Sequence, residues 1–255
     1  MKEFFKKSAH HWKLLLKDKT FLISFISSIV LSLLSYAITI AVSLHIDSQY
    51  YAPVGDLILN RIPTYNLDIL FTWGIWVIVV SSIFYTVLWR PEITPFALKS
   101  FALMYFVRCG FIILTDVGPP EGFYYENIIE STDSVFQMLI FKNDLFFSGH
   151  VAIPFLSFLV FRKSIFSWFM LLASFIMAIT VLLMHIHYSI DVFAAFFITY
   201  SIYALSDKIF NNMNIRYKEI INKYGWESMK NKIKYRKKRN KEKRYKDFKS
   251  PTPAS

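Results

Sequence analysis

The feature that most constrains this chain is a series of apolar segments, each close to the length of a helix that crosses a membrane. Such a helix needs about 20 apolar residues to cross roughly 30 Å of hydrocarbon. Six segments meet or approach this length: residues 21–45, 68–89, 95–115, 145–161, 165–184 and 190–206. Hydrophobic residues make up 55% of the chain, more than a soluble domain of this size can bury. The sequence therefore predicts an all-α polytopic membrane protein, a six-transmembrane-helix bundle.

The charged residues predict how this bundle is oriented. Lys and Arg gather in the N-terminal segment, in the connections at 90–99 and 162–163, and in the C-terminal tail. The other connections are acidic, with Arg61 and Lys142 as their basic residues. Their acidic residues are Asp47, Asp56, Asp68, Asp116, Glu121, Glu126, Glu130, Asp133 and Asp144. Because basic loops stay cytoplasmic, we expect a multi-pass protein of the cell membrane, with cytoplasmic termini and the acidic loops on the exterior or lumenal side.

The excess positive charge lies entirely in the tail. From Asp207 onward, 16 Lys and Arg stand against 5 Asp and Glu, and the rest of the chain is neutral. A basic tail can bind nucleic acid or an anionic membrane, and its place after an apolar segment favours the anionic lipid surface over nucleic acid. We divide the chain into an amphipathic juxtamembrane segment (1–20), a six-helix membrane domain (21–210) and a basic cytoplasmic tail (211–255) with a disordered end.

Two histidines and a carboxylate surround the start of the sixth apolar segment. His187 and Asp191 are four residues apart. If the helix begins at or just before His187, both side chains share one face, about one turn apart. The carboxylate can then accept the Nδ1 proton and leave Nε2 as a nucleophile or base, while His185 points to nearly the opposite side. The alternative is a histidine at the membrane interface beside an acidic helix N-terminus.

Ser148, Gly149 and His150 open the fourth apolar segment. A helix N-terminus offers free N–H groups to an anion, and glycine lets the backbone approach a ligand closely. His150 can then donate a proton to a leaving oxygen. The alternative is an ordinary serine cap followed by a polar interface residue.

Arg108 lies inside the third apolar segment, on the order of 10 Å below its outer end. A central arginine costs roughly 2.5–3.5 kcal/mol to insert, and such residues usually face a cavity or a partner. A phosphate bound among Arg108, His150 and His187 would supply the compensating charge. Snorkelling of the side chain to the surface is the alternative.

Metal chemistry and serine catalysis fit the sequence less well. His150, His185, His187 and Asp191 could ligate zinc, but the sequence has no cysteine pair and no His-Glu-x-x-His motif. Ser148 lacks the Gly-x-Ser-x-Gly elbow of a serine nucleophile. We therefore expect no metal and no cofactor.

Together, these motifs resemble the sphingomyelin synthase branch of the type-2 phosphatidate phosphatase superfamily. Residues 144–150 fit its Asp-x-x-x-Ser-Gly-His motif, and residues 187–192 fit its His-Tyr-[Ser/Thr]-x-Asp-Val motif. Tyr105, Arg108 and Thr115 match a third, Tyr-x-x-Arg with a later Thr. The motifs occur in order over roughly 53–200, although Lys142-Asn143 replaces the usual Cys-Gly and Val151 replaces a Thr.

The resemblance implies a two-step reaction without a metal. His187 would be the nucleophile that forms a phosphohistidine, Asp191 its orienting partner and His150 the proton donor. The remaining motif residues would contact the substrate: Tyr105, Arg108, Asp144, Ser148, Gly149 and Tyr188. A phosphocholine- or phosphoethanolamine-type head group would pass from a membrane phospholipid to the hydroxyl of a ceramide- or diacylglycerol-like acceptor at the outer leaflet.

Two other functions remain open. In a lipid phosphate phosphatase, water would replace the acceptor lipid, and in a non-catalytic lipid-binding or scrambling protein the motifs would do no chemistry. The Lys-x6-Arg-Pro signature of the plain phosphatase branch is absent from the sequence, which favours transfer over hydrolysis.

Overall fold

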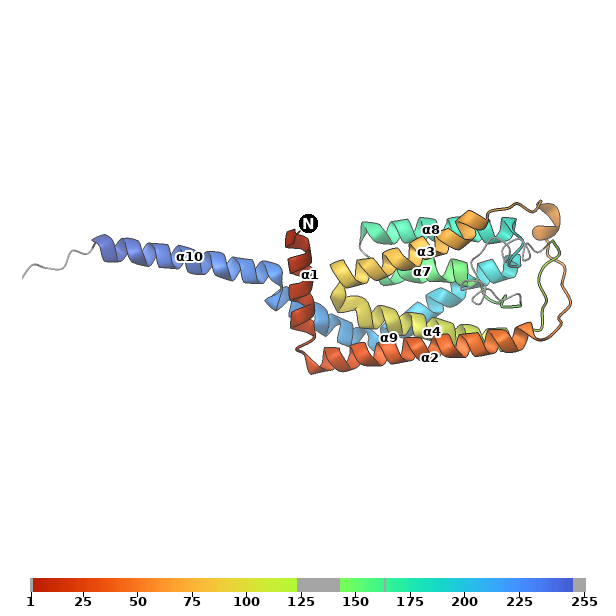
Figure 1. Ribbon diagram of the computed structural model, residues 1–255, viewed down its shortest axis with the longest axis horizontal. Helices are drawn as coiled ribbons and strands as arrows, with labels where there is room; N and C mark the ends of the chain where they lie inside the picture. Colours follow the sequence, from red (N-terminus) through yellow and green to blue (C-terminus); the bar gives the residue numbers. More distant parts are fainter. Residues whose placement is uncertain (1, 123–142, 163, 250–255) are drawn as a thin grey trace, which may run out of the picture.

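The computed structural model describes residues 2–122, 143–162 and 164–249, whose regular structure is helical throughout. The long helices form a bundle with roughly parallel axes (Figure 1). In chain order, the helices are α1 (Lys2–Leu15), α2 (Lys19–Asp47), the short η1 (Leu59–Arg61), α3 (Asp68–Phe84), the π-helical η2 (Tyr85–Trp89), the short η3 (Pro91–Ile93), α4 (Thr94–Ile113), α7 (Gly149–Val160), α8 (Ile165–Leu183), α9 (Ser189–Tyr224) and α10 (Trp226–Lys249).

Five helical segments of the described chain are long and apolar enough to cross a membrane. They are Lys19–Asp47, Asp68–Trp89, Pro91–Ile113, Ile165–Leu183 and Ser189–Phe210. Each corresponds to a segment predicted from the apolar runs. The predicted all-α, polytopic membrane architecture is therefore confirmed.

The fourth predicted span, residues 145–161, is wrong in its extent. Its helix, α7, has 12 residues, which at 1.5 Å per residue gives about 18 Å, well short of a full span. Residues 143–148 precede it as non-helical chain. Figure 1 shows α7 as a short helix beside the longer α8.

Helix α2 shows why these helices suit lipid rather than water. Its buried face carries small hydroxyl residues, whereas Ile23 and Leu33 on the outside are 68% and 66% exposed. Several of these hydroxyls bond to carbonyls of the same helix, as when Ser28 donates to the Phe25 carbonyl at 2.7 Å. Small side chains let helices approach closely in a membrane, and α2 packs along α4 in this way.

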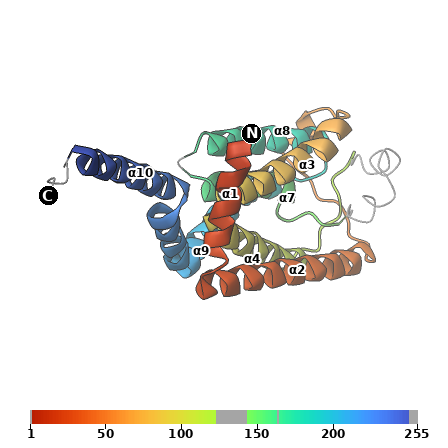
Figure 2. The ribbon, with the colours of Figure 1, turned by 60° about the vertical axis from the view of Figure 1, so that its left-hand side comes forward.

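The two terminal helices lie at one end of the bundle. Helix α1 crosses that end and α10 points away from it (Figures 1 and 2). Helix α9 runs unbroken through the predicted boundary at 210 and ends at Tyr224. The disordered end expected at 250–255, and the loop and hairpin residues Glu126, Glu130, Asp133, Lys142 and Lys163, lie outside the described residues.

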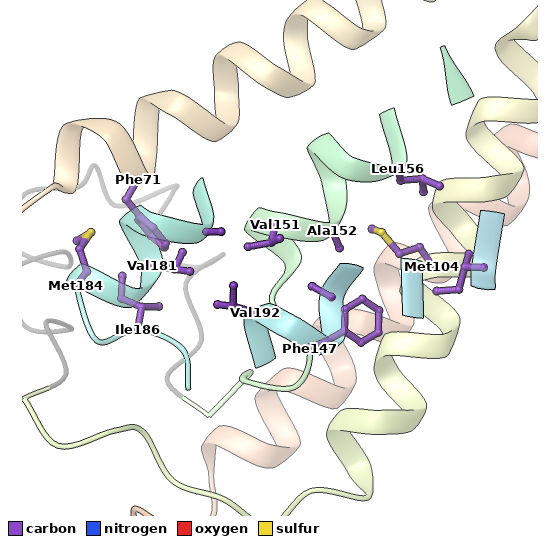
Figure 3. Packing of buried hydrophobic residues seen from close by; sticks show 13 residues of the cluster. Phe71, Met104, Phe147, Val151, Ala152, Leu156, Val181, Met184, Ile186 and Val192 are labelled. Atoms are coloured by element: carbon purple, nitrogen blue, oxygen red, sulfur yellow. The ribbon is translucent and has the colours of Figure 1, made fainter. Parts of the chain in front are cut away.

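The largest buried apolar cluster lies directly behind the two histidine motifs. Phe147 and Val151 flank the start of α7, while Ile186 and Val192 flank the start of α9. Residues from α3, α4 and α8 pack against them, among them Phe71, Met104 and Val181 (Figure 3). The starts of α7 and α9, distant in sequence, are therefore held in one close-packed region.

Candidate active site

His187 and Asp191 form a buried pair at the start of α9. Nδ1 of His187 lies 3.6 Å from Oδ2 of Asp191, and the two residues are 4% and 2% exposed. The distance fits an ion pair but is longer than a hydrogen bond; such contacts often tighten when substrate binds. The carboxylate also accepts the Tyr188 backbone N–H at 2.9 Å. Asp191 is therefore fixed beside Nδ1, which leaves Nε2 for chemistry.

The pair does not arise from one helical face, as the sequence predicted. Helix α9 begins at Ser189, so His187 precedes it by two residues. Asp191 is the third helical residue, and its side chain folds back to the N–H groups that precede the helix, as acidic residues at this position often do. The four-residue spacing identified the pair, but helix capping creates it.

The second motif meets the first through Ser148. Its backbone N–H donates to the Asp191 carbonyl at 3.3 Å, which joins the starts of α7 and α9. Its hydroxyl is fully buried, and neither this Oγ nor Nδ1 of His187 has a hydrogen-bond partner among the described residues. Buried polar atoms without partners are rare and require an explanation. Nδ1 of His187 faces the Asp191 carboxylate, so the Ser148 hydroxyl is the group at this junction that could bind a substrate.

His150, the second residue of α7, lies against α3. Its ring stacks on Phe71 with the centroids 4.0 Å apart and the planes inclined by 19°. The structure places His187 beside Asp191, and it joins the start of α7, which carries His150, to the start of α9 through Ser148.

Arg108 points inward and is held by the segment that precedes α7. Its Nε donates to the Phe147 carbonyl at 2.8 Å, its Nη1 lies 2.8 Å from the Asp144 carboxylate, and its Nη2 donates to the Asp144 carbonyl at 3.1 Å. The side chain is 7% exposed, so it does not snorkel to the surface. These contacts draw two carbonyls toward Arg108, which explains why residues 144–147 are not helical. A guanidinium has five N–H groups, so the three contacts leave capacity for an anion.

The other predicted substrate contacts occupy different surroundings. Tyr105, one turn before Arg108, packs against the main apolar cluster. A side chain at Gly149 would place its Cβ 3.6 Å from Nε of Arg108, so the glycine keeps open the space beside the guanidinium. The Tyr188 hydroxyl donates to the Gly118 carbonyl at 2.8 Å and accepts the Val54 N–H at 3.0 Å, which commits it to two loops.

His185 is turned away from the pair. It follows the last turn of α8 with a positive φ of 51°, a conformation that commonly ends a helix. Its Nδ1 lies 3.0 Å from the Glu121 carbonyl. The expected separation of His185 from His187 is present, although it comes from a turn and not from opposite faces of a helix.

Sequence reasoning gave little weight to Asp56, which the structure connects to this region. One oxygen accepts the backbone N–H groups of Ile58 and Leu59 at 2.8 and 3.0 Å. The other accepts the backbone N–H and hydroxyl of Ser189 at 2.7 and 2.8 Å. Burial alone would raise the pKa of this carboxyl, but the hydrogen bonds hold its pKa below the ordinary value. The available signal was an acidic residue after the Pro53-Val54-Gly55 turn.

The described residues contain no group of three His, Cys, Asp or Glu side chains placed to hold a metal ion. His185, a candidate zinc ligand, faces the Glu121 carbonyl. A small polar pocket does open nearby between the 53–60 loop, Pro120-Glu121 and Tyr188.

Comparison with known proteins shows a similarity over one part of the chain. Residues 143–208 match the family model described as PAP2 superfamily C-terminal. A search of curated proteins gave no match. The matched segment contains both histidine motifs and the helices that carry them, whereas Arg108 and Asp56 lie before it. This segment, which includes the buried histidine–aspartate pair, is therefore similar to the C-terminal part of the type-2 phosphatidate phosphatase superfamily.

Proposed function

We propose that this protein transfers the phosphate-bearing head group of a membrane phospholipid to the hydroxyl of a second lipid, as sphingomyelin synthases do. The observation that carries the proposal is the junction of the two motifs, where the N–H of Ser148, two residues before His150, donates to the Asp191 carbonyl beside the buried His187–Asp191 pair. The donor is of the phosphocholine or phosphoethanolamine type, and the acceptor is ceramide- or diacylglycerol-like.

In the first step, Nε2 of His187 attacks the phosphorus while the bond to the lipid oxygen breaks. His150 gives a proton to that oxygen, and the lipid alcohol leaves. Asp191 keeps the proton on Nδ1 and balances the positive charge of the phosphorylated imidazole. The remaining N–H groups of Arg108 and the N-terminus of α7 face the phosphate oxygens, where they favour developing negative charge.

In the second step, the acceptor hydroxyl attacks the same phosphorus and the P–N bond breaks. His150, now neutral, takes the proton of that hydroxyl. His187 and His150 thereby return to their starting states, and the product carries a new head-group ester. Each step forms one bond to phosphorus and breaks one.

The burial of His187 favours transfer over hydrolysis. His187 is 4% exposed, so a phosphoryl group carried by it would be shielded from bulk water, and exclusion of water suppresses hydrolysis of reactive intermediates. Hydrolysis, as in a lipid phosphate phosphatase, is the alternative with the same first step. We further propose that the site faces the exterior or lumen, that both termini are cytoplasmic, and that the basic tail meets anionic lipid.

The test is product analysis with the purified protein in detergent. Labelled phosphatidylcholine and phosphatidylethanolamine are supplied with ceramide and with diacylglycerol, and the products are identified by mass spectrometry. A new head-group ester supports transfer, and free head-group phosphate supports the phosphatase. If neither product forms, the protein is a non-catalytic lipid-binding protein.

His187→Ala should lose at least a thousandfold in turnover, because it removes the nucleophile. His185→Ala is the matched control and should be much milder. His150→Ala and Asp191→Ala should each fall by orders of magnitude in folded protein. Near-normal turnover by His187→Ala would exclude the phosphohistidine route.

Turnover should also survive exhaustive treatment with EDTA or phenanthroline, since no step uses a metal. Elemental analysis of the treated protein checks that metal has been removed. Loss of turnover that added zinc restores would contradict the metal-free route.

A further inference from the structure

The first two backbone N–H groups after His187 are each held by a carboxylate. Asp191 accepts the N–H of Tyr188, and Asp56 accepts the N–H of Ser189. These are consecutive N–H groups, and His187 is the residue immediately before them. The direction in which the chain presents the imidazole is therefore set by both acids. Asp191 is local, whereas Asp56 comes from a loop 133 residues away in the sequence.

Asp56, like Asp191, is buried and held by hydrogen bonds to backbone N–H groups. It is 8% exposed, and its two oxygens accept four hydrogen bonds, two from the N–H groups of Ile58 and Leu59 at the start of η1 and two from Ser189. These bonds hold its pKa below the ordinary value against the effect of burial, so the group is charged at neutral pH. A negative charge at the first turn of α9 is favourable, and charge-assisted hydrogen bonds are the strong ones.

The neighbouring contacts reinforce the same junction. Tyr188 joins Val54 to Gly118 through its hydroxyl, and the Gly118 N–H donates to the Ala52 carbonyl at 3.0 Å. Leu59 packs with Tyr188 and Leu145 in a small buried cluster. Polar and apolar contacts thus hold the 52–59 loop against the start of α9. Asp56 is the charged residue among them.

We propose that Asp56 is a positioning residue for His187. It acts through Ser189 and the first turn of α9, without contact to the reacting atoms. This inference rests on the proposed function, because it assigns Asp56 the task of holding the nucleophile at the angle that the phosphate requires. Small errors in the position of a reacting group cost large factors in rate, so a loosened α9 start should lower kcat and leave substrate binding nearly unchanged.

The experiment compares three variants, Asp56→Ala, Asp56→Asn and Ser189→Ala, with Asp18→Ala as the matched control. Asp18 also caps a helix, accepting the Phe21 N–H at 2.9 Å, and also pairs with a second side chain, Arg216, at 2.9 Å. It lies at the opposite end of the bundle, beside α1. Two readouts are taken on detergent-purified protein: kcat and KM with the lipid pair that wild type converts, and amide hydrogen exchange of the peptide that covers residues 186–192.

Asp56→Ala should lower kcat by about ten- to hundredfold with KM within about twofold, and should speed exchange at the start of α9. Asp56→Asn keeps one acceptor and should fall between Asp56→Ala and wild type. Ser189→Ala removes only the hydroxyl and should lower kcat by a smaller factor. This variant tests the Asp56–Ser189 contact if Asp56→Ala does not fold. Asp18→Ala should change neither kcat nor this exchange.

Unchanged kcat in Asp56→Ala would overturn the proposal, and so would a fall in kcat without faster exchange. An equal fall in kcat in Asp18→Ala would also overturn it, because general destabilisation would then explain the loss. Wild-type protein that converts no lipid would defeat the proposed function instead. Exchange would then still report whether Asp56 holds the start of α9.

Discussion

Arg108 shows how one side chain can serve the fold and the chemistry together. Its guanidinium holds the Asp144 carboxylate and the carbonyls of Asp144 and Phe147. This pairing offsets the cost of placing a charge inside an apolar segment. It also fixes the chain immediately before Ser148, so the position of the α7 N-terminus depends on Arg108 whether or not a phosphate is bound.

Arg108→Lys should therefore be far from conservative. Lysine presents a single ammonium and cannot span three acceptors held by a planar fork. We expect kcat/KM to fall by about ten- to hundredfold, since charge-assisted hydrogen bonds contribute roughly 1.5–3 kcal/mol each. Arg108→Ala leaves the partly buried Asp144 without its partner and should cost up to about 3 kcal/mol of stability. Steady-state kinetics and thermal unfolding in detergent measure the two effects.

Arg162→Lys is the control, because Arg162 lies over the Tyr203 ring with 4.6 Å to its centroid, at the other end of α7. It should keep wild-type kcat/KM. Equal activity with Arg, Lys and Ala at position 108 would show that neither the clamp on residues 144–147 nor a phosphate contact matters.

At the scale of elements, the short α7 concentrates the chemistry. Because the helix begins at Gly149 and not at residue 145, its free N–H groups lie beside Arg108, and the N–H of the preceding Ser148 donates to the Asp191 carbonyl. Broken helices of this kind are tolerated in membranes where the irregular chain is buried in protein and its polar groups are satisfied. Arg108 satisfies two of those carbonyls here.

Gly149→Ala tests whether the space beside Arg108 is used. The added methyl would lie 3.6 Å from Nε of Arg108, an ordinary contact, so the variant should fold with wild-type stability or slightly above it. If an anion approaches the α7 N-terminus at this point, the methyl should obstruct it and lower kcat/KM by about tenfold or more. Thermal unfolding and lipid turnover are measured on the same preparation.

Gly110→Ala is the matched control. Gly110 is also helical, and an added Cβ there meets no atom within 4 Å. Its turnover should be unchanged. If Gly149→Ala also turns over lipid normally, the start of α7 is not an anion-binding position.

The sequence predicted the elements whose cause is local and missed those whose cause is distant. The long helices follow from the length of apolar runs, and the His187–Asp191 pair from a four-residue spacing. The late start of α7 depends on Arg108, which contacts residues 36 and 39 positions away. The Asp56–Ser189 contact spans 133 residues. Neither separation carries a periodic signal, so no pattern in the chain could reveal it.

At the scale of the whole molecule, α1 packs across the end of the bundle opposite the site. Trp12 donates its indole N–H to the Val87 carbonyl at 2.8 Å, and Ser8 donates to the same oxygen at 3.2 Å. Val87 lies in the π-helical turn η2, where the wider turn frees carbonyls from the helical ladder. The predicted amphipathic segment therefore buries its inner face on protein and not only on lipid.

Trp12→Phe should lower stability by about 0.5–1.5 kcal/mol, the net contribution of one hydrogen bond. Lipid turnover should stay at the wild-type level, because the site lies at the other end of the bundle. Trp73→Phe, at a position 65% exposed on α3, is the control and should change neither quantity. If Trp12→Phe is fully folded but has a lower kcat, the two ends of the bundle are coupled.

The extension of α9 beyond the membrane divides the basic tail into a structural part and a dispensable part. Tyr217 is 2% exposed, packs with Leu15 and Phe21, and donates to the Thr20 carbonyl at 3.2 Å. Farther along, Trp226 donates its backbone N–H to Nε2 of His11, and Lys230 pairs with Glu3. The α10 side chains described beyond Ile233 are exposed.

A chain that ends at Lys230 should therefore keep wild-type kcat and KM in detergent, because it retains every contact with α1 named above and the site lies at the opposite end. A chain that ends at Ile215 loses Tyr217 and Arg216 and should unfold several degrees lower, since burial of an aromatic side chain contributes about 1.5–3 kcal/mol. Size-exclusion profiles, thermal unfolding and lipid turnover of both chains make the comparison. Loss of turnover in well-folded 1–230 protein would mean that the distal part of α10 acts on the site from the opposite end of the bundle.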